Sequence, residues 1–143
     1  MTSTLDLSAL RSAIVSLQDG LGVVEDKAWF DAQNAAVKNT LIAGVIQNFE
    51  FVYEISIKMI KRQIEAEAAS PEEVDESNFR EVLRVAAEKG LIADIEAWFQ
   101  YRKMRNITAH TYDHEKAQKV YKGTLDFIGD ASALLKRLEA RNG

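Results

Sequence analysis

Residues 41–64 read LIAGVIQNFEFVYEISIKMIKRQI, and this stretch decides the fold. Apolar side chains recur in it every three or four residues, which is the spacing of one face of an α-helix. We predict a long helix over about residues 35–68, with an apolar face made by Ile42, Val45, Phe49, Val52, Ser56, Met59 and Gln63 and widened by Ile46, Tyr53 and Ile60. This apolar face is wider than the surface that one neighbouring helix would cover. We therefore expect part of it to contact a second copy of the chain.

Four further segments are predicted to be helical, over about residues 6–26, 77–89, 92–108 and 113–141. The first has an apolar seam of Leu7, Leu10, Ile14, Leu17, Leu21 and Val24. The last two contribute the core candidates Ile95, Trp98, Phe99, Met104, Ala117, Val120, Leu125, Phe127, Ile128, Leu134, Leu135 and Leu138. Asp6 and Ser77 are the expected N-caps of the first and third helices, and Gly90 is the expected end of the third.

The connections between the long helices are short, which favours antiparallel neighbours. The sequence therefore predicts an all-α fold, an up-and-down antiparallel bundle of four main helices plus the short third helix. With 143 residues and no linker, the chain is expected to form a single domain over residues 1–143. Residues 68–77 around Pro71 are expected to form an acidic, solvated loop.

Composition excludes several classes of function. The chain has no cysteine, so thiolate metal sites and disulfides are excluded. The net charge of −4 disfavours a general nucleic-acid binder and favours a protein partner, although a local basic patch could still contact RNA. No apolar run is long enough for a membrane span, and the N-terminus lacks the pattern of a secretory signal, so a cytoplasmic location is expected.

The candidate chemistry lies at residues 105–112, RNITAHTY. On one continuous helix Arg105 and His110 would point about 140° apart, but a helix that ends near Thr108 would let the two side chains converge. The histidine could then move protons, and the arginine could stabilise the charge on a phosphorane, which together allow RNA cleavage without a metal. The alternative is a surface arginine beside a histidine at a helix end.

Polar neighbours surround this pair. Asn106 supplies an amide, Thr111 a hydroxyl and Tyr112 a phenol, and the N-terminus of a helix capped by Asp113 would favour a nearby anion. Thr111 and Asp113 can equally serve only to end one helix and begin the next. His114 follows His110 by four residues, but no third ligand completes a metal site, so neither a metal nor a cofactor is expected.

Glu50 and Glu54 lie one helical turn apart on the long helix. Paired carboxylates can support acid–base chemistry. The alternative is a polar strip, solvated or between helices, in which Glu54 forms an i, i+4 ion pair with Lys58.

The motif R-x4-H-x-Y at residues 105–112 resembles the signature of HEPN proteins, in the branch of nucleotidyltransferase substrate-binding proteins. Residues 46–58 are similar to the long-helix pattern of that branch, and residues 90–98 are similar to the approach to its motif. Together the matches reach from about Leu41 to Tyr121. Ile57 departs from the family pattern, in which a tryptophan is expected, and this leaves the local packing open.

The resemblance implies a homodimer that is partnered with a separately encoded minimal nucleotidyltransferase, as toxin and antitoxin or as binding and catalytic subunits. It also implies a metal-independent endoribonuclease cleft that uses Arg105 and His110 of both protomers, with Asn106 in support. Tyr112, beside Thr111, would be the residue that the nucleotidyltransferase adenylylates. Three hypotheses remain open at this stage: an RNA-cleaving subunit, a subunit that binds a nucleotide without cleaving, and a helical adaptor.

Overall fold

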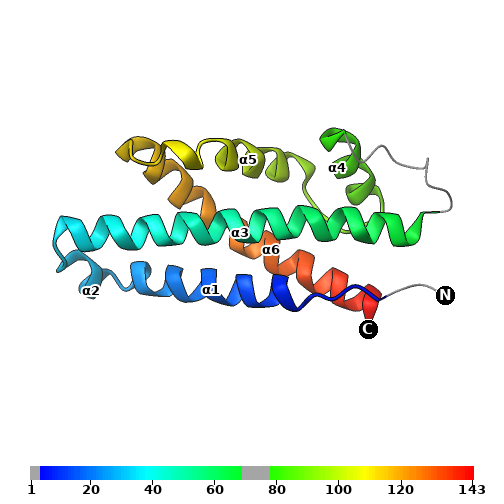
Figure 1. Ribbon diagram of the computed structural model, residues 1–143, viewed down its shortest axis with the longest axis horizontal. Helices are drawn as coiled ribbons and strands as arrows, with labels where there is room; N and C mark the ends of the chain where they lie inside the picture. The colour runs from blue at the N-terminus through cyan, green and yellow to red at the C-terminus, as the bar shows by residue number, and fades with distance from the viewer. Residues whose placement is uncertain (1–3, 69–77) are drawn as a thin grey trace.

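A computed structural model describes residues 4–68 and 78–143 of the chain. In these ranges the regular structure is helical, with no strand. The helices are α1 (Ser8–Glu25), α2 (Lys27–Asp31), α3 (Ala35–Glu67), α4 (Phe79–Glu88), α5 (Ile95–Asn106), the 3₁₀ helix η1 (Thr108–His110) and α6 (His114–Asn142). Successive long helices reverse direction (Figure 1), so the predicted up-and-down antiparallel bundle is confirmed.

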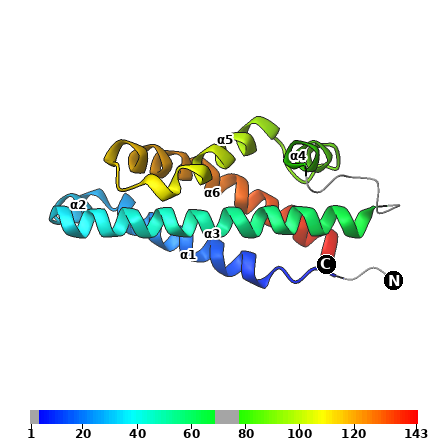
Figure 2. The ribbon, with the colours of Figure 1, turned by 45° about the horizontal axis from the view of Figure 1, so that its top comes forward.

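The long helix α3 lies between the other elements. α1 packs along one side of it, α4 and α5 lie on another, and α6 crosses it at an angle (Figures 1 and 2). Asn34 begins α3, because its side-chain oxygen accepts a hydrogen bond from the Val37 amide at 2.9 Å. Every residue predicted for its apolar face is buried. Phe51 is the one large apolar side chain of α3 that is exposed, so most of the broad face is used within the protomer.

The seam of α1 is buried as predicted, and the centre of the core is an aromatic cluster. Phe127 of α6 contacts three rings edge-to-face, with centroid distances of 4.8 Å to Phe49, 5.9 Å to Trp98 and 4.9 Å to Tyr101. Edge-to-face contacts place the positive rim of one ring on the negative face of another. The cluster therefore joins α3, α5 and α6 near the middle of α5.

Leu125 was predicted to lie in the core, and this prediction is wrong: the side chain is 41% exposed. The inward positions of α6 are Ala117, Val120, Tyr121, Thr124, Phe127, Ala131, Leu134 and Leu138. Leu125 follows the buried Thr124 by one residue, or about 100° around the helix, and so faces solvent. Thr124 remains inside because its hydroxyl donates to the Val120 carbonyl oxygen at 2.8 Å.

One predicted N-cap needs correction, and one short helix was not predicted. Asp6 does not cap α1, because Leu7 occupies the N-cap position. The carboxylate of Asp6 accepts a hydrogen bond from the amide of Ser8, the first residue of the helix. The first helix stops at Glu25, and a short helix, α2, follows it, begun by Asp26. Asn78 caps α4, whereas the predicted cap Ser77 and the acidic loop at 69–77 lie outside the described residues.

Gly90 ends the α4 region as predicted. It adopts a φ of +76°, in the left-handed region that other residues rarely enter. Among the helices of the described ranges, none combines the length and the apolar character needed to cross a bilayer.

Two leucines of α6 test this arrangement with the same substitution. Leu134 is fully buried, so Leu134→Ala should lower the free energy of unfolding by about 2–5 kcal/mol, through lost burial and the cavity left behind. Leu125→Ala is the matched control and should cost less than 1 kcal/mol, because a partly exposed side chain loses little. Chemical denaturation of both variants measures the difference. Equal losses would contradict the observed orientation of α6.

Candidate functional site

The motif lies at a break between two helices, as the sequence predicted. α5 ends at Asn106, one turn of 3₁₀ helix follows, and Asp113 begins α6 by accepting a hydrogen bond from the Glu115 amide at 3.0 Å. Two threonine hydroxyls stabilise the break, because Thr108 and Thr111 each reach the carbonyl oxygen three residues earlier, at 2.9 and 3.0 Å. The break holds the eight-residue motif in a compact turn on the surface.

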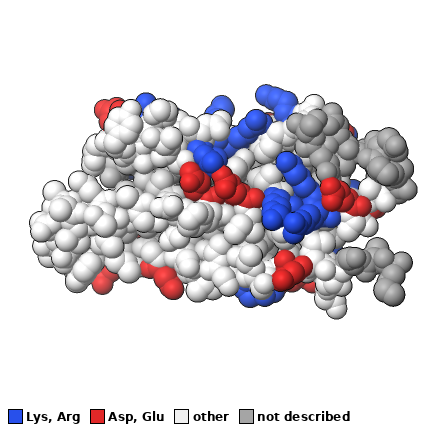
Figure 3. Space-filling model, viewed as in Figure 1, with Lys and Arg blue, Asp and Glu red and all other residues white. Residues whose placement is uncertain are grey.

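Arg105 is held against α3 by two carboxylates. Its Nε and Nη2 both donate to Oε1 of Glu54, at 2.8 and 2.6 Å, and its Nη1 lies 3.4 Å from Oε1 of Glu50. The hydrogen bonds to Glu54 raise the pKa of Arg105, and the charges of Glu50 and Glu54 act in the same direction. Figure 3 shows acidic and basic side chains meeting on this face, between α3 and α5. The side chain is thus fixed in position while about a third of it remains exposed.

Thr108 completes the cluster, and sequence reasoning missed it. Its Oγ1 lies 2.7 Å from Glu50 Oε1 and 3.4 Å from Arg105 Nη1. The available signal was its position three residues after Arg105, which places both residues on one side of a helix end.

The paired glutamates form an inter-helix polar strip, one of the two forms that the sequence left open. The partner expected for Glu54 was wrong, however. Glu54 pairs with Arg105 of α5, and among the described residues no ion pair joins it to Lys58. The guanidinium of Arg105 is a better partner for a carboxylate than an ammonium at i+4, because it can present two N–H groups at once.

His110 is the last residue of the 3₁₀ helix η1. Its side chain is exposed and its ring lies 6.1 Å from that of Tyr112, edge to face. Within the described part of the chain, no hydrogen bond or ring contact joins His110 to Arg105. Asn106 is also exposed, at the last position of α5. One protomer therefore presents two groups: Arg105 with its carboxylates, and His110 with Tyr112.

Tyr112 differs sharply from the other three tyrosines of the chain. Its side chain is 86% exposed, whereas those of Tyr53, Tyr101 and Tyr121 are at most 7% exposed. Tyr101 and Tyr121 donate their hydroxyls to carboxylates of Asp130 and Glu25. Burial raises the pKa of Tyr53 to about 12. Tyr112 is the tyrosine whose phenol is open to a reagent or an enzyme.

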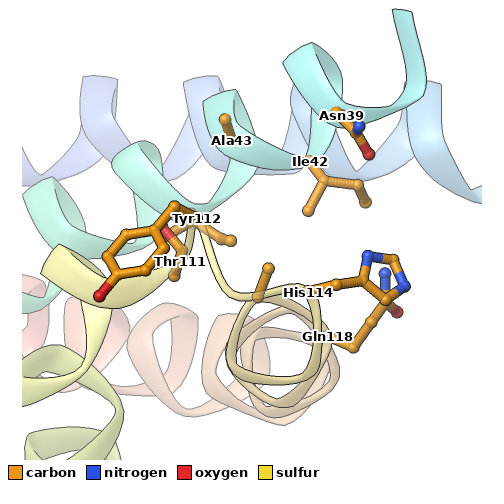
Figure 4. Close-up of a pocket in the computed structure, with 9 residues that line it drawn as sticks. Asn39, Ile42, Ala43, Thr111, Tyr112, His114 and Gln118 are labelled. Atoms are coloured by element: carbon orange, nitrogen blue, oxygen red, sulfur yellow. The ribbon is translucent and has the colours of Figure 1, made fainter. Parts of the chain in front are cut away.

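A pocket of about 270 Å³ adjoins the motif, between α3 and the first turns of α6 (Figure 4). Its lining comprises Asn39, Ile42, Ala43, Ile46, Thr111, Tyr112, His114, Ala117 and Gln118. The pocket brings Thr111 and Tyr112 together with Ile42 and Ile46 of the apolar face of α3, and with Asn39 and Ala43, which the sequence did not single out. His114 faces this pocket, and in the described ranges no group of three acidic or histidine side chains could hold a metal ion.

Comparisons with known proteins agree with this architecture. Residues 5–140 match the family described as nucleotidyltransferase substrate binding protein like. The chain is 47% identical, over 99% of its length and 97% of the relative's, to a Haemophilus influenzae protein named probable ribonuclease HepT. It also matches a solved Haemophilus influenzae structure, described as the fold of a substrate binding domain of a nucleotidyltransferase. That match has a TM-score of 0.91 and 46% identity, and covers 94% of this chain and 99% of the other. With its helical fold and its motif turn, the chain belongs to the nucleotidyltransferase substrate binding protein-like family.

Proposed function

We propose that this chain is the partner subunit of a minimal nucleotidyltransferase, and that two copies of it form a metal-independent endoribonuclease cleft in a toxin–antitoxin pair. The observation that carries the proposal is the motif turn, which fixes Arg105 and leaves His110 and Tyr112 open to solvent. The family description and the name of the Haemophilus influenzae relative support the same reading.

Cleavage without a metal needs groups that move protons and a group that carries charge. The imidazole of His110 would take the proton of a ribose 2′-hydroxyl as that oxygen attacks the adjacent phosphorus. The second His110 of a dimer would give a proton to the departing 5′-oxygen, leaving a cyclic phosphate and a 5′-hydroxyl. Arg105 would hold the negative charge that builds on the phosphorane oxygens. Because one protomer has a single His110, this scheme requires two protomers.

A homodimer also fits the surface of α3. Phe51 is 48% exposed and lies three residues before Glu54, which is the spacing of neighbours on a helix, so an apolar side chain lies next to the Arg105 cluster. A second copy that covered Phe51 would bring its own motif turn close to the first. Polar residues elsewhere on the motif turn, including Asn106 and Thr111, would then face the cleft.

Tyr112 would be the point of control. Its phenol oxygen would attack the α-phosphorus of ATP in the nucleotidyltransferase partner, forming a phosphodiester with AMP as the proton and pyrophosphate leave. Its exposure of 86% makes it accessible to a second enzyme. The added phosphate would lie beside His110 and repel the phosphate of an RNA substrate.

A second function is favoured by one observation. Arg105 is already paired with Glu54 and lies near Glu50, so the cluster carries a net charge of about −1 at neutral pH. A site of this charge attracts RNA weakly, which suits a subunit that binds a nucleotide for its partner without cleaving it.

His110→Ala and Arg105→Lys test the cleavage hypothesis. Each should lower the rate of RNA cleavage, measured with a chelator present, by about 100-fold or more, because the first removes the proton carrier and the second the planar charge-stabilising group. Arg62→Lys, at an exposed position of α3, is the matched control and should leave the rate unchanged. The rate per protomer should also fall on dilution. Wild-type protein that cleaves no RNA under these conditions would support the binding function instead.

Tyr112→Phe tests the modification. Intact mass after incubation with ATP and the nucleotidyltransferase should show one added adenylyl group on the wild-type chain and none on the variant, because phenylalanine has no nucleophilic oxygen. Tyr53→Phe is the control: that hydroxyl is buried, so adenylylation should persist. Modification of the Tyr112→Phe chain would contradict the assignment.

Glu54→Gln tests the charge balance at Arg105. Glutamine keeps the shape and an acceptor oxygen but removes one negative charge close to the phosphate site, so RNA should bind about threefold more tightly at low salt. The gain should disappear near 1 M salt, where the screening length is only about 3 Å. Glu65→Gln, on the same helix and exposed, is the matched control. Weaker binding by Glu54→Gln would indicate that Glu54 serves to position Arg105 for the phosphate.

A further inference from the structure

The pocket beside Tyr112 combines an apolar floor with polar groups at its mouth. Ile42, Ile46 and Ala117 form the floor and are each at most 9% exposed. Asn39 of α3 and Gln118 of α6 present their amides at the rim. Figure 4 shows Asn39 and Ile42 reaching from α3 toward His114 and Gln118, with Tyr112 on the opposite flank.

The polar groups of the rim are available to a ligand. The side chains of Asn39, His114 and Gln118 form no hydrogen bond with any described residue of the chain. An amide offers two N–H donors and a carbonyl acceptor, so Asn39 and Gln118 together can match an edge that carries both donors and acceptors. The lining has no lysine, arginine or carboxylate, so it suits a neutral group better than an anion.

The pocket and the Arg105 cluster lie along one face of α3. Residues 39, 43, 46, 50 and 54 follow a spacing of three or four, which places them in one row on a helix. Asn39, Ala43 and Ile46 line the pocket, and Glu50 and Glu54 contact Arg105. With a helical rise of 1.5 Å per residue, Glu50 lies about 6 Å from Ile46 along the axis of α3. It lies about 10 Å from Ala43 along the same axis.

These distances and this chemistry suit one class of ligand. A nucleobase is flat, has apolar faces and carries mixed donors and acceptors on its edge, and proteins read unstacked bases in this way. Pockets for drug-sized ligands have about 300–1,000 Å³, so a volume of about 270 Å³ fits a single ring system better than a whole nucleotide. The phosphate of the same nucleotide would lie outside the pocket, one or two helical turns along α3.

We propose that this pocket binds the nucleobase of a nucleotide whose phosphate is held at Arg105. Ile42, Ile46 and Ala117 contact the base, and the amides of Asn39 and Gln118 bind its edge. The inference deepens the proposed function, on which it depends for the position of the phosphate. The base can belong to a strand of RNA or to a mononucleotide such as AMP, because both present the same chemistry.

Nucleoside binding to the full-length chain tests the pocket separately from catalysis. Adenosine and uridine should produce saturable shifts in NMR titrations, whereas ribose, which lacks the base, should produce none. The double variant Asn39→Ala/Gln118→Ala should weaken nucleoside binding about tenfold, through the loss of two hydrogen bonds. The matched control Gln18→Ala/Gln47→Ala removes two amides from exposed positions outside the pocket and should bind as wild type does.

Ala43→Trp provides a steric test, because an indole at this exposed wall position would fill the pocket with little strain on the core. It should abolish nucleoside binding. Parallel titrations with AMP and with a short single-stranded RNA identify the source of the base: a loss of RNA affinity assigns it to RNA, and a loss confined to AMP assigns it to a mononucleotide.

Two results would overturn the inference: ribose binding as well as adenosine, or unchanged nucleoside affinity in both pocket variants. The proposed nuclease fails on different evidence, namely the absence of RNA cleavage by the wild-type chain. Nucleoside binding without cleavage would therefore retain the pocket and remove the nuclease.

Discussion

The burial of α3 is the constraint on which the rest of the structure depends. This helix contacts α1, α4, α5, η1 and α6, so its inward positions must be apolar or internally satisfied along most of its length. Such a helix can carry chemistry only on the narrow face that its neighbours leave open. Glu50, Glu54 and the pocket wall at 39–46 occupy that face, and the motif turn packs against it. The site is therefore built by a turn that is placed on a rigid helix.

The position of Arg105 illustrates how this rigidity serves function. Ion pairs at exposed positions contribute only about 0–1 kcal/mol, so Glu54, whose side chain is 54% exposed, would give way to a phosphate at the proposed site at small cost. Until then it holds the guanidinium in one place and reduces the loss of side-chain entropy on binding. At the proposed phosphate site, an anion would therefore have to compete with the carboxylates of Glu50 and Glu54 for the N–H groups of Arg105.

The sequence predicted most of the fold because helical periodicity is strong in long segments. The faces of α1 and α3 were assigned residue by residue, and the helix break before His110 followed from the local pattern. What it could not predict depends on contacts between distant segments. Leu125 is apolar, as a core residue would be, but it lies one position after the buried Thr124 and faces solvent. The helix α2 has five residues, which are too few to show a helical period in the sequence. Glu54 pairs with Arg105 instead of Lys58 because α5 packs on α3, which the sequence alone does not show. The pocket likewise joins Asn39 and Gln118, which lie 79 residues apart in the chain.

Tyr112 connects the two parts of the site. Tyr112 is part of the pocket lining, and its hydroxyl points away from His114 (Figure 4). Its ring lies 6.1 Å from that of His110. A phosphodiester on that hydroxyl would add negative charge to a side chain whose ring lies 6.1 Å from the imidazole that is proposed to move protons. It would also repel an incoming phosphate and crowd the space beside the imidazole. A single modification of the most exposed tyrosine would thus oppose the binding of an RNA phosphate at the proposed cleft without any change in the helical core.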